Sequence, residues 1–357
     1  MTLTFLIPCY NVERYVAQCL DSIFAVETFR LGHIGHTDND FEVVCVNDCS
    51  TDSTSLILHS YEKSHPNLKI IDLPQNIGWG GVRNIAMQQA VGQFIWFVDS
   101  DDTIVSEQLV RIVDNVVSED LDVLAFNFNN LDADGSLLKT YTIFNNSDIL
   151  SGKAFVRKYF AHNFGANIGF VWRFIYKSEF IKRHNILFPE GRCWEDSIFV
   201  PQTILMAERM KSIEVVAYNY WRHYSSAVMT FSKLKPARMI YWFCINAGRD
   251  ILQLSHQIDE PDISKMLYDI AVDGYFNQIA LLLCQTNRRE RKVFYDIVQE
   301  EKHRAEIKEV LPYMSILQKF LLTPYLQRPL AELTAFCYHI KHLDPLYKKH
   351  SMVSKQN

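Results

Sequence analysis

Three aspartates lie within four residues of one another, in the run Asp99-Ser100-Asp101-Asp102 that follows the apolar segment FIWFV. Carboxylates this close together repel one another, so a fold retains them most easily when a cation neutralises their charge. Their oxygens suit Mg²⁺ or Mn²⁺, which proteins often bind together with substrate phosphates. The run therefore predicts a divalent metal site, because the apolar segment before it indicates the edge of a core rather than a solvated loop.

Two further polar turns follow apolar segments in the first hundred residues. One is Pro8-Cys9-Tyr10-Asn11, after residues 3–7, and the other begins at Asp48, after residues 41–47. A single turn of this kind is more often a simple turn or a helix cap than a binding site. Three at one sheet edge favour a site, because ligands of open α/β sheets bind outside the carboxyl ends of the strands.

The elements that must position these turns alternate between short apolar runs and helical patterns, which is typical of βαβ units on a largely parallel sheet. Strands are expected at residues 3–7, 41–47, 68–73, 93–98 and 122–128, and helices at 12–24 and near 82–90. Asn11 is a plausible cap for the first helix.

The middle and end of the chain differ in pattern from its first third. Residues 129–150 are rich in Asn, Asp, Ser and Gly and are expected to form a flexible insertion. Residues 170–177 and 213–221 look extended, and a helix opens at Glu195-Asp196 between them. From about residue 233 the pattern is nearly all helical, which puts the border between two domains near residue 230.

Length and composition agree with a globular protein of two unequal units, because 357 residues exceed one small domain. The net charge of −5 gives no basic field of the kind that holds nucleic acid. The start MTLTFLIPCY resembles neither a signal peptide nor a membrane span, so we expect a cytoplasmic protein. Eight cysteines without any CxxC pair are expected to be mostly buried, reduced thiols.

The chain resembles the nucleotide-sugar domain of family 2 glycosyltransferases, a large group with the GT-A fold. Over residues 3–105 the resemblance rests on the runs FLIPCYNVERYVAQCLDSI, VVCVNDCSTDST and NIGWGGVRNIAMQQAVGQFIWFVDSDD. Further on, VWRFIYKSEFIKRHNILFPEGRCWEDSIFVPQTI and VVAYNYWRHYSS are similar to the acceptor half of bacterial capsule and lipopolysaccharide members. The order and spacing of these blocks are more specific than any lone DxD motif.

This resemblance implies an α/β fold: a mixed, mostly parallel GT-A sheet, followed by a helical C-terminal region. Residues 1–230 would form the catalytic domain, with nucleotide-sugar binding in 1–105 and acceptor binding in 106–230, and residues 231–357 would be helical. The implied activity is inverting, Mn²⁺- or Mg²⁺-dependent transfer from a nucleotide diphosphate sugar, with a UDP-sugar favoured. The acceptor would be a saccharide or lipid-linked saccharide in cell-surface polysaccharide synthesis.

The family's donor-site roles carry over to named positions of this sequence. Pro8, Tyr10 and Asn11 would line the base and ribose, with Glu13 nearby, and Asp48 would bind a uracil-type base. Asp99 would touch the ribose or the metal, Asp101 would bind the metal, and Asp102 would support that site. Arg83 would face phosphate or brace the acidic run, with a surface salt bridge as the alternative.

The general base implied by the resemblance is Asp196, in the family's Glu-Asp position. The alternative is that Glu195 and Asp196 only stabilise the first turn of a helix. Arg222 or His223 would contact the diphosphate or metal, although a histidine in an aromatic segment is often only packed.

Several features depart from the family's pattern and leave the donor sugar open. Residues 27–40 are longer than the usual connection and contain His33, His36, Asp38 and Asp40, which fit a solvated loop better than a second metal site. Cys49 replaces a glycine, and Trp79 is bulkier than usual.

Two other functions remain as alternatives: a nucleotidyltransferase acting on a sugar phosphate, and a non-catalytic sugar-nucleotide binder. In the C-terminal region, residues 316–336 fit packing against the catalytic domain or peripheral contact with the inner face of the membrane.

Overall fold

The structure, a computed structural model, describes residues 1–25, 41–143, 146–163, 169–191, 194–223, 240–276, 288–299 and 308–313. The chain divides into two compact units, Met1–His223 and Tyr224–Asn357.

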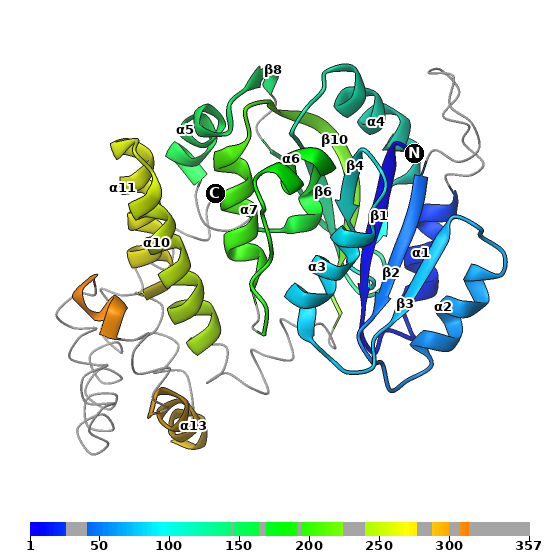
Figure 1. The fold of residues 1–357 in the computed structure, drawn as a ribbon, viewed down its shortest axis with the longest axis horizontal. Helices are drawn as coiled ribbons and strands as arrows, with labels where there is room; N and C mark the ends of the chain where they lie inside the picture. Colours follow the sequence, from blue (N-terminus) through cyan, green and yellow to red (C-terminus); the bar gives the residue numbers. More distant parts are fainter. Residues whose placement is uncertain are drawn as a thin grey trace. The chain divides into compact units, whose positions relative to one another are not determined.

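A mixed β-sheet organises the first unit, with the strand order β3-β2-β1-β4-β9-β6-β10-β5 (Figure 1). These strands are β1 (Leu3–Cys9), β2 (Phe41–Asn47), β3 (Leu68–Asp72), β4 (Phe94–Phe97), β5 (Thr103–Ile104), β6 (Val123–Leu131), β9 (Phe174–Lys177) and β10 (Met210–Trp221). Strands β3, β2, β1 and β4 run parallel, as do β6 and β10, while β9 lies antiparallel between β4 and β6. Strands β1 and β2 are buried along their whole length, as expected for parallel strands covered on both faces.

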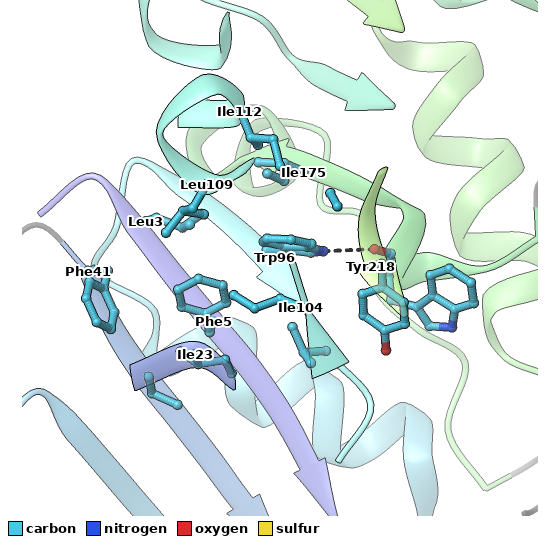
Figure 2. Packing of buried hydrophobic residues seen from close by; sticks show 14 of the residues in the cluster. Leu3, Phe5, Ile23, Phe41, Trp96, Ile104, Leu109, Ile112, Ile175 and Tyr218 are labelled. Carbon is cyan, nitrogen blue, oxygen red and sulfur yellow. Dashed lines mark hydrogen bonds between the residues drawn. The ribbon is translucent and has the colours of Figure 1, made fainter. Parts of the chain in front are cut away.

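Helices cover both faces of this sheet. They are α1 (Val16–Phe24), α2 (Thr54–Glu62), α3 (Gly78–Gln89), α4 (Leu109–Ser118), α5 (Gly152–Asn163), α6 (Ser178–Arg183) and α7 (Asp196–Met206). On the face of α1 and α4, the Phe5 ring packs against the rings of Phe41 and Trp96, at centroid distances of 5.8 and 5.6 Å (Figure 2). On the other face, Phe97 of β4 packs against Phe199 of α7 at 5.9 Å. Two apolar layers thus fix the sheet and the helix α7, which carries Asp196.

The second unit is helical in the parts that the structure describes. It contains α10 (Gly248–Gln257), α11 (Pro261–Asp269), α13 (Arg288–Gln299) and two π-helical segments, Ile240–Ala247 and Ile270–Phe276. Apolar residues that recur at helical spacing are buried here, among them Ile251, Leu254, Ile263 and Leu267. Across the described ranges, no helix is both long and apolar enough to cross a membrane.

The expectation of a flexible insertion over residues 129–150 is wrong. Strand β6 continues to Leu131, β7 (Leu137–Tyr141) pairs with β6, and β8 (Asn146–Leu150) pairs with β10. Asn129, one of the residues that suggested a loop, is bonded inside the sheet: its amide donates to Asn219 at 3.1 Å and accepts from Thr140 at 2.8 Å. Satisfied amides can occupy strands, so composition alone was misleading here.

The first helix starts later than expected, at Val16, and Asn11 is not its cap. Asn11 has a φ of 52° and serves a different turn. The third helix starts earlier, at Gly78, so the glycine-bearing segment is part of it. Cys9, Cys19, Cys45 and Cys244 are buried free thiols, as expected, whereas Cys49 is only partly buried. Residues 27–40 and 316–336, with the metal and membrane alternatives attached to them, lie outside the described residues.

Candidate active site

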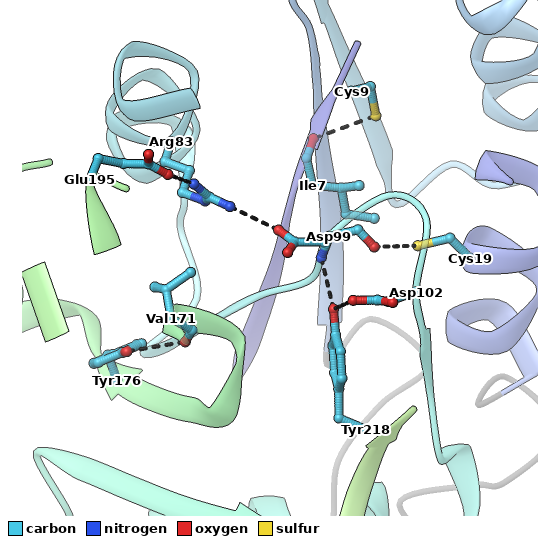
Figure 3. Close-up of polar contacts among 10 residues, drawn as sticks. All are labelled: Ile7, Cys9, Cys19, Arg83, Asp99, Asp102, Val171, Tyr176, Glu195 and Tyr218. Carbon is cyan, nitrogen blue, oxygen red and sulfur yellow. Dashed lines mark hydrogen bonds and ion pairs between the residues drawn. The ribbon is translucent and has the colours of Figure 1, made fainter. Parts of the chain in front are cut away.

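The acidic run, residues 99–102, follows β4 at the edge of the sheet where the parallel strands have their carboxyl ends. Asp102 is the most buried of its three aspartates, at 1% exposed. The two carboxylate oxygens of Asp102 accept hydrogen bonds from the Tyr218 hydroxyl and the Trp221 backbone N–H, both at 2.8 Å. The Tyr218 hydroxyl in turn accepts a hydrogen bond from the Asp99 N–H at 3.1 Å (Figure 3). Burial, together with Asp101 and Asp99, raises the pKa of Asp102 well above its ordinary value. Asp102 therefore anchors the acidic run to β10.

Arg83 connects the acidic run to the start of α7. Its guanidinium donates to Asp99 Oδ1 at 2.8 Å and forms an ion pair with Glu195 Oε1 (Figure 3). Burial alone would lower the pKa of Arg83, but Glu195, Asp99 and Asp196 together raise it, so the guanidinium stays charged. The residue is 7% exposed, so this is a buried brace between two elements rather than the surface salt bridge considered above.

Asp101 and His223 lie side by side. The His223 Nε2 is 3.0 Å from the Asp101 carbonyl oxygen, and the imidazole packs on the Tyr15 ring at 4.0 Å. With Nε2 donating to a carbonyl, the neutral ring keeps Nδ1 as its acceptor. Burial and the Asp99 carboxylate raise the pKa of Asp101 to about 6, and His223 opposes this shift. Asp99 and Asp101 thus share the loop after β4, whereas His223 follows β10 and its imidazole bonds to the backbone carbonyl of Asp101 rather than to its carboxylate.

The carboxyl group of Asp196 lies at the start of α7, next to the Arg83 brace. Burial, Glu195 and Asp99 together raise its pKa to about 8, against the opposing effect of the Arg83 charge. Glu195 occupies the N-cap position without a side-chain capping bond. Trp194, just before it, has a φ of 58°, in the left-handed region that a bulky residue rarely adopts. The backbone therefore turns sharply just before α7, and this turn places Asp196 near the Arg83 guanidinium and the Glu195 carboxylate.

The turns after β1 and β2 are joined by reciprocal side-chain to backbone hydrogen bonds. Asn11 Oδ1 accepts from the Thr51 N–H at 2.8 Å, and the Asn11 N–H donates to Ser50 Oγ at 3.0 Å. Glu13 Oε2 accepts from the Ser53 N–H at 2.9 Å, at the start of α2. Asn11 and Glu13 therefore hold the two turns together, and the neighbouring Tyr10 is 44% exposed.

Asp48 is buried at the end of β2 and organises the start of α3. Its carboxylate oxygens accept the N–H groups of Ile77 and Gly78, at 2.7 and 2.9 Å. Each oxygen has a second lone pair, so the carboxylate can still accept from a ligand. The same residue thus positions the helix that carries Arg83, a role that its sequence position did not suggest.

Sequence reasoning missed Tyr218 and Trp221, although the extended segment around them was expected. No pattern marks them, because their function depends on contacts across more than a hundred residues.

The remaining predicted residues lie as follows. Pro8 is buried within β1, Trp79 is partly exposed in α3, and the Arg222 backbone N–H bonds to the Leu131 carbonyl at 2.9 Å. Two clusters result: one around Asp99, Arg83 and Asp196, and one joining the turns after β1 and β2.

Several known proteins are similar to this chain. An uncharacterised glycosyltransferase of Bacillus subtilis (strain 168), EpsJ, is 28% identical over 235 residues, covering 66% of this chain and 64% of EpsJ. The poly(ribitol-phosphate) beta-N-acetylglucosaminyltransferase TarS of Staphylococcus aureus (strain Mu50) is 31% identical over 244 residues, covering 64% of this chain and 38% of TarS. The chain thus spans less than two thirds of the length of these relatives.

Solved structures show the same fold. The crystal structure of S. aureus TarS 1-349 in complex with UDP-GlcNAc matches 96% of this chain and 91% of that one, with a TM-score of 0.65 and 21% identity. The mannosyltransferase PcManGT of Pyrobaculum calidifontis, in complex with GDP-Man and Mn²⁺, matches with a TM-score of 0.52 and 14% identity. The expected GT-A sheet with a helical C-terminal region is confirmed.

The family model described as glycosyl transferase family 2 matches residues 4–184, just over half of the 357 residues. This range holds the turns after β1, β2 and β4, together with Arg83. The chain therefore belongs to glycosyl transferase family 2.

Proposed function

We propose that this protein is an inverting glycosyltransferase that moves a sugar from a UDP-sugar to a saccharide or lipid-linked saccharide in cell-surface polysaccharide synthesis. Membership of the family supports the reaction class. The relative TarS acts on poly(ribitol phosphate) with N-acetylglucosamine, and the TarS structure that shares this fold contains UDP-GlcNAc, which supports a UDP-sugar donor.

The observation that carries this proposal is the Asp196 carboxyl beside the Arg83 brace. In the proposed reaction Asp196 takes the proton of an acceptor hydroxyl while that oxygen bonds to the anomeric carbon. The bond between this carbon and the diphosphate oxygen breaks, and UDP leaves with the bonding electrons. Because one displacement occurs from the face opposite the leaving group, the anomeric configuration inverts.

Arg83 and Glu195 support this step by fixing geometry and charge. The Arg83 guanidinium forms ion pairs with Asp99, in the loop after β4, and with Glu195, at the start of α7. These two ion pairs fix the position of Asp99 relative to α7. Its positive charge also favours the ionised form of Asp196, which the reaction requires, against burial and the charge of Glu195.

The carboxylates of Asp99 and Asp101 fit a divalent cation whose coordination shell is completed by the phosphate oxygens of the substrate. Among the residues that the structure describes, no three His, Cys, Asp or Glu side chains lie close enough together to enclose a metal ion. Mg²⁺ and Mn²⁺ commonly bind through one or two carboxylates plus phosphate oxygens, so Asp101 and Asp99 would hold the ion with the diphosphate. When bound, the ion would offset the charge on the departing UDP. The mannosyltransferase structure that shares this fold contains Mn²⁺, which supports a divalent cation as cofactor.

A screen of nucleotide sugars with Mn²⁺ tests the function. We expect slow release of UDP from one UDP-sugar, loss of this release in EDTA, and loss in Asp101→Asn. Calorimetry provides a second readout: Mn²⁺ should bind measurably with UDP present and at least tenfold more weakly without it. Release of pyrophosphate from a nucleoside triphosphate and a sugar phosphate would instead identify a nucleotidyltransferase. Tight binding of a UDP-sugar without any turnover would identify a non-catalytic binder.

A further inference from the structure

Helix α3 and the segment that leads to α7 are joined by a side chain that bonds like a strand of a β-sheet. Asn84 of α3 is 5% exposed, and its Nδ2 donates to the Phe188 carbonyl at 2.9 Å. Its Oδ1 accepts from the Phe188 N–H, also at 2.9 Å, and Nδ2 donates further to Glu190 Oε1 at 3.1 Å. One buried amide thus satisfies both backbone groups of a residue 104 positions away.

Gly80 lets the same segment approach the backbone of α3. A methyl group on this glycine would lie 2.1 Å from the Pro189 carbonyl oxygen, much closer than two such atoms can come. Gly80 and Asn84 lie on one face of α3, because residues four positions apart in a helix share a face. We call these two residues the α3 clamp, since both touch the segment at residues 188–190.

The segment that the clamp holds also contacts α7. The Phe188 ring stacks on the Phe199 ring of α7 at 3.8 Å and an interplanar angle of 4°, and it meets the Phe97 ring of β4 edge-on at 5.3 Å. Phe199 comes one turn after Asp196, where α7 begins. A shift of Phe188 would therefore be transmitted to the turn of α7 that carries Asp196.

The clamp adjoins the Arg83 brace. Arg83 precedes Asn84 in α3, and its guanidinium lies 5.7 Å from the centre of the Phe188 ring while it pairs with Glu195 (Figure 3). The start of α3 is held at the donor side, because the Asp48 carboxylate accepts the N–H groups there. Helix α3 therefore connects the turn after β2 with the segment before α7.

We propose that Asn84 and Gly80 are positioning residues for the general base, Asp196. By holding residues 188–190 against α3, they fix the start of α7 relative to the donor. This inference rests on the proposed function, because Asp196 is the base of that reaction. A base must lie within hydrogen-bond reach of the proton that it takes, so a displacement of about 1 Å can lower the rate by roughly a hundredfold.

The segment can yield when the clamp changes, whereas α3 is held on its inner side. Leu187 is 50% exposed and Glu190 is also exposed, so the segment borders solvent. Helix α3 buries Val82, Ala86 and Met87 and contacts β1 and β2. Crowding between the two should therefore displace the segment rather than the helix.

A pair of glycine substitutions tests the clamp by crowding. Gly80→Ala drives the Pro189 carbonyl away from α3, and α3 itself should stay intact because alanine favours a helix more than glycine does. Gly81→Ala is the matched control. Its added methyl group meets the flexible end of the Ile77 side chain, at 2.9 Å, instead of the segment.

A pair of asparagine substitutions tests the clamp by removing hydrogen bonds. Asn84→Ala removes the bonds to Phe188 and Glu190. Asn127→Ala is the matched control, because this similarly buried amide of β6 accepts from the Ile143 N–H at 2.6 Å and does not contact the segment through the clamp.

The assay is the slow release of UDP from the UDP-sugar that the nucleotide-sugar screen identifies, with Mn²⁺ present and water as the acceptor, in the full-length chain. We expect Gly80→Ala and Asn84→Ala to lower kcat at least tenfold, while the KM for the UDP-sugar and the UDP dissociation constant stay within threefold. Both controls should keep kcat within threefold. A loss in kcat without a loss of donor binding distinguishes positioning of the base from support of the fold.

Hydrogen exchange gives a readout that does not depend on activity. The backbone amides of residues 194–200 should exchange at least tenfold faster in the two clamp variants than in their controls, because the start of α7 is then held less firmly. Equal exchange in the clamp variants and the controls would show that the clamp does not hold α7, and it would overturn the inference.

Three kinetic results would also overturn the inference while the proposed function stands. The first is an unchanged kcat in Gly80→Ala, and the second is an equal loss in Gly80→Ala and Gly81→Ala, which would place the effect in α3 itself. The third is a parallel loss of kcat and UDP binding in Asn84→Ala. An unchanged protein that releases UDP from no nucleotide sugar would contradict the proposed function itself, and the role of the clamp in catalysis would fall with it.

Discussion

Asp196 carries a carboxyl group whose surroundings oppose its ionisation. Burial and the neighbouring Glu195 raise its pKa from 3.8 to about 8, and Arg83 only partly compensates. Because the folded protein binds this proton more tightly than the unfolded chain does, the stability contributed by the group is fully present below pH 3.8 and is lost as the pH rises toward 8. The carboxyl group of Asp196, which we assign as the general base, therefore destabilises the fold at neutral pH.

Asp196→Asn separates this catalytic role from a helix-start role. The variant keeps the side-chain shape but cannot accept the proton, so kcat for transfer should fall by roughly 10²–10⁴ while UDP affinity stays near that of the unchanged protein. Its melting temperature should be higher than that of the unchanged protein, and the difference should grow between pH 5 and pH 8. A variant that melts lower, with most of its rate retained, would mean that Asp196 only stabilises α7.

Glu195→Gln provides the matched comparison at the adjacent position. It removes one charge from the buried pair with Arg83, so we expect a loss of about 3–5 kcal/mol in unfolding free energy. Denaturant titration of the two amide variants side by side measures this contrast. A Glu195→Gln protein as stable as the unchanged one would show that Arg83 does not depend on this partner.

Cys49 has a φ of 58°, a left-handed conformation that favours glycine. Cys49→Gly should therefore raise the unfolding free energy by about 0.5–1 kcal/mol, because the relief of backbone strain exceeds the added entropy of the unfolded chain. Cys49→Ala removes the thiol but keeps the strained Cβ, and it should give no gain. Equal stability of the two variants in denaturant titrations would contradict this account.

At the scale of elements, the strands of the parallel half could be predicted well because each is a short, mostly apolar run between helical patterns. The turns after β1, β2 and β4 could also be predicted as a group, since parallel strands end at one edge. The β6–β7 hairpin could not, because Asn129 resembles a loop residue and its amide is bonded both to Thr140 and to Asn219, ninety positions away. For the same reason the roles of Tyr218 and Trp221 required the fold.

The Tyr218 hydroxyl links β10 to the acidic run, so removal of this hydroxyl should disturb the donor site. Tyr218→Phe removes the donor to Asp102 and the acceptor for the Asp99 N–H, so it should weaken UDP binding in the presence of Mn²⁺ by about five- to fiftyfold and lower stability by about 1–3 kcal/mol. Tyr176→Phe is the matched control, because this tyrosine is equally buried and its hydroxyl donates to the Val171 carbonyl rather than to the acidic run. Equal losses of UDP affinity in both variants would mean that Tyr218 acts only through packing.

At the scale of the whole molecule, we propose that donor binding belongs to the first unit alone. This unit ends at His223, and Trp221 and His223 attach the end of β10 to the acidic run. Residues 1–230 were expected to be catalytic, with donor binding in 1–105 and acceptor binding in 106–230. The contacts of residues 99–102 reach far beyond residue 105, because Asp99 and Asp102 bond to Tyr218 and Arg83 pairs with both Asp99 and Glu195.

A truncated chain of residues 1–223 tests this division. Because the brace from Arg83 to Glu195 and the anchor from Tyr218 to Asp102 both lie within it, we expect a cooperatively unfolding protein that binds UDP and Mn²⁺ within about threefold of the full-length affinity. Acceptor-independent release of UDP should persist, and any loss confined to transfer would assign the second unit a role with the acceptor. A shorter chain of residues 1–217 removes Tyr218, Trp221 and His223 and should lose UDP binding altogether. If the 1–223 chain folds but does not bind UDP, residues beyond 223 must contribute to the donor site, and the proposed division would be wrong.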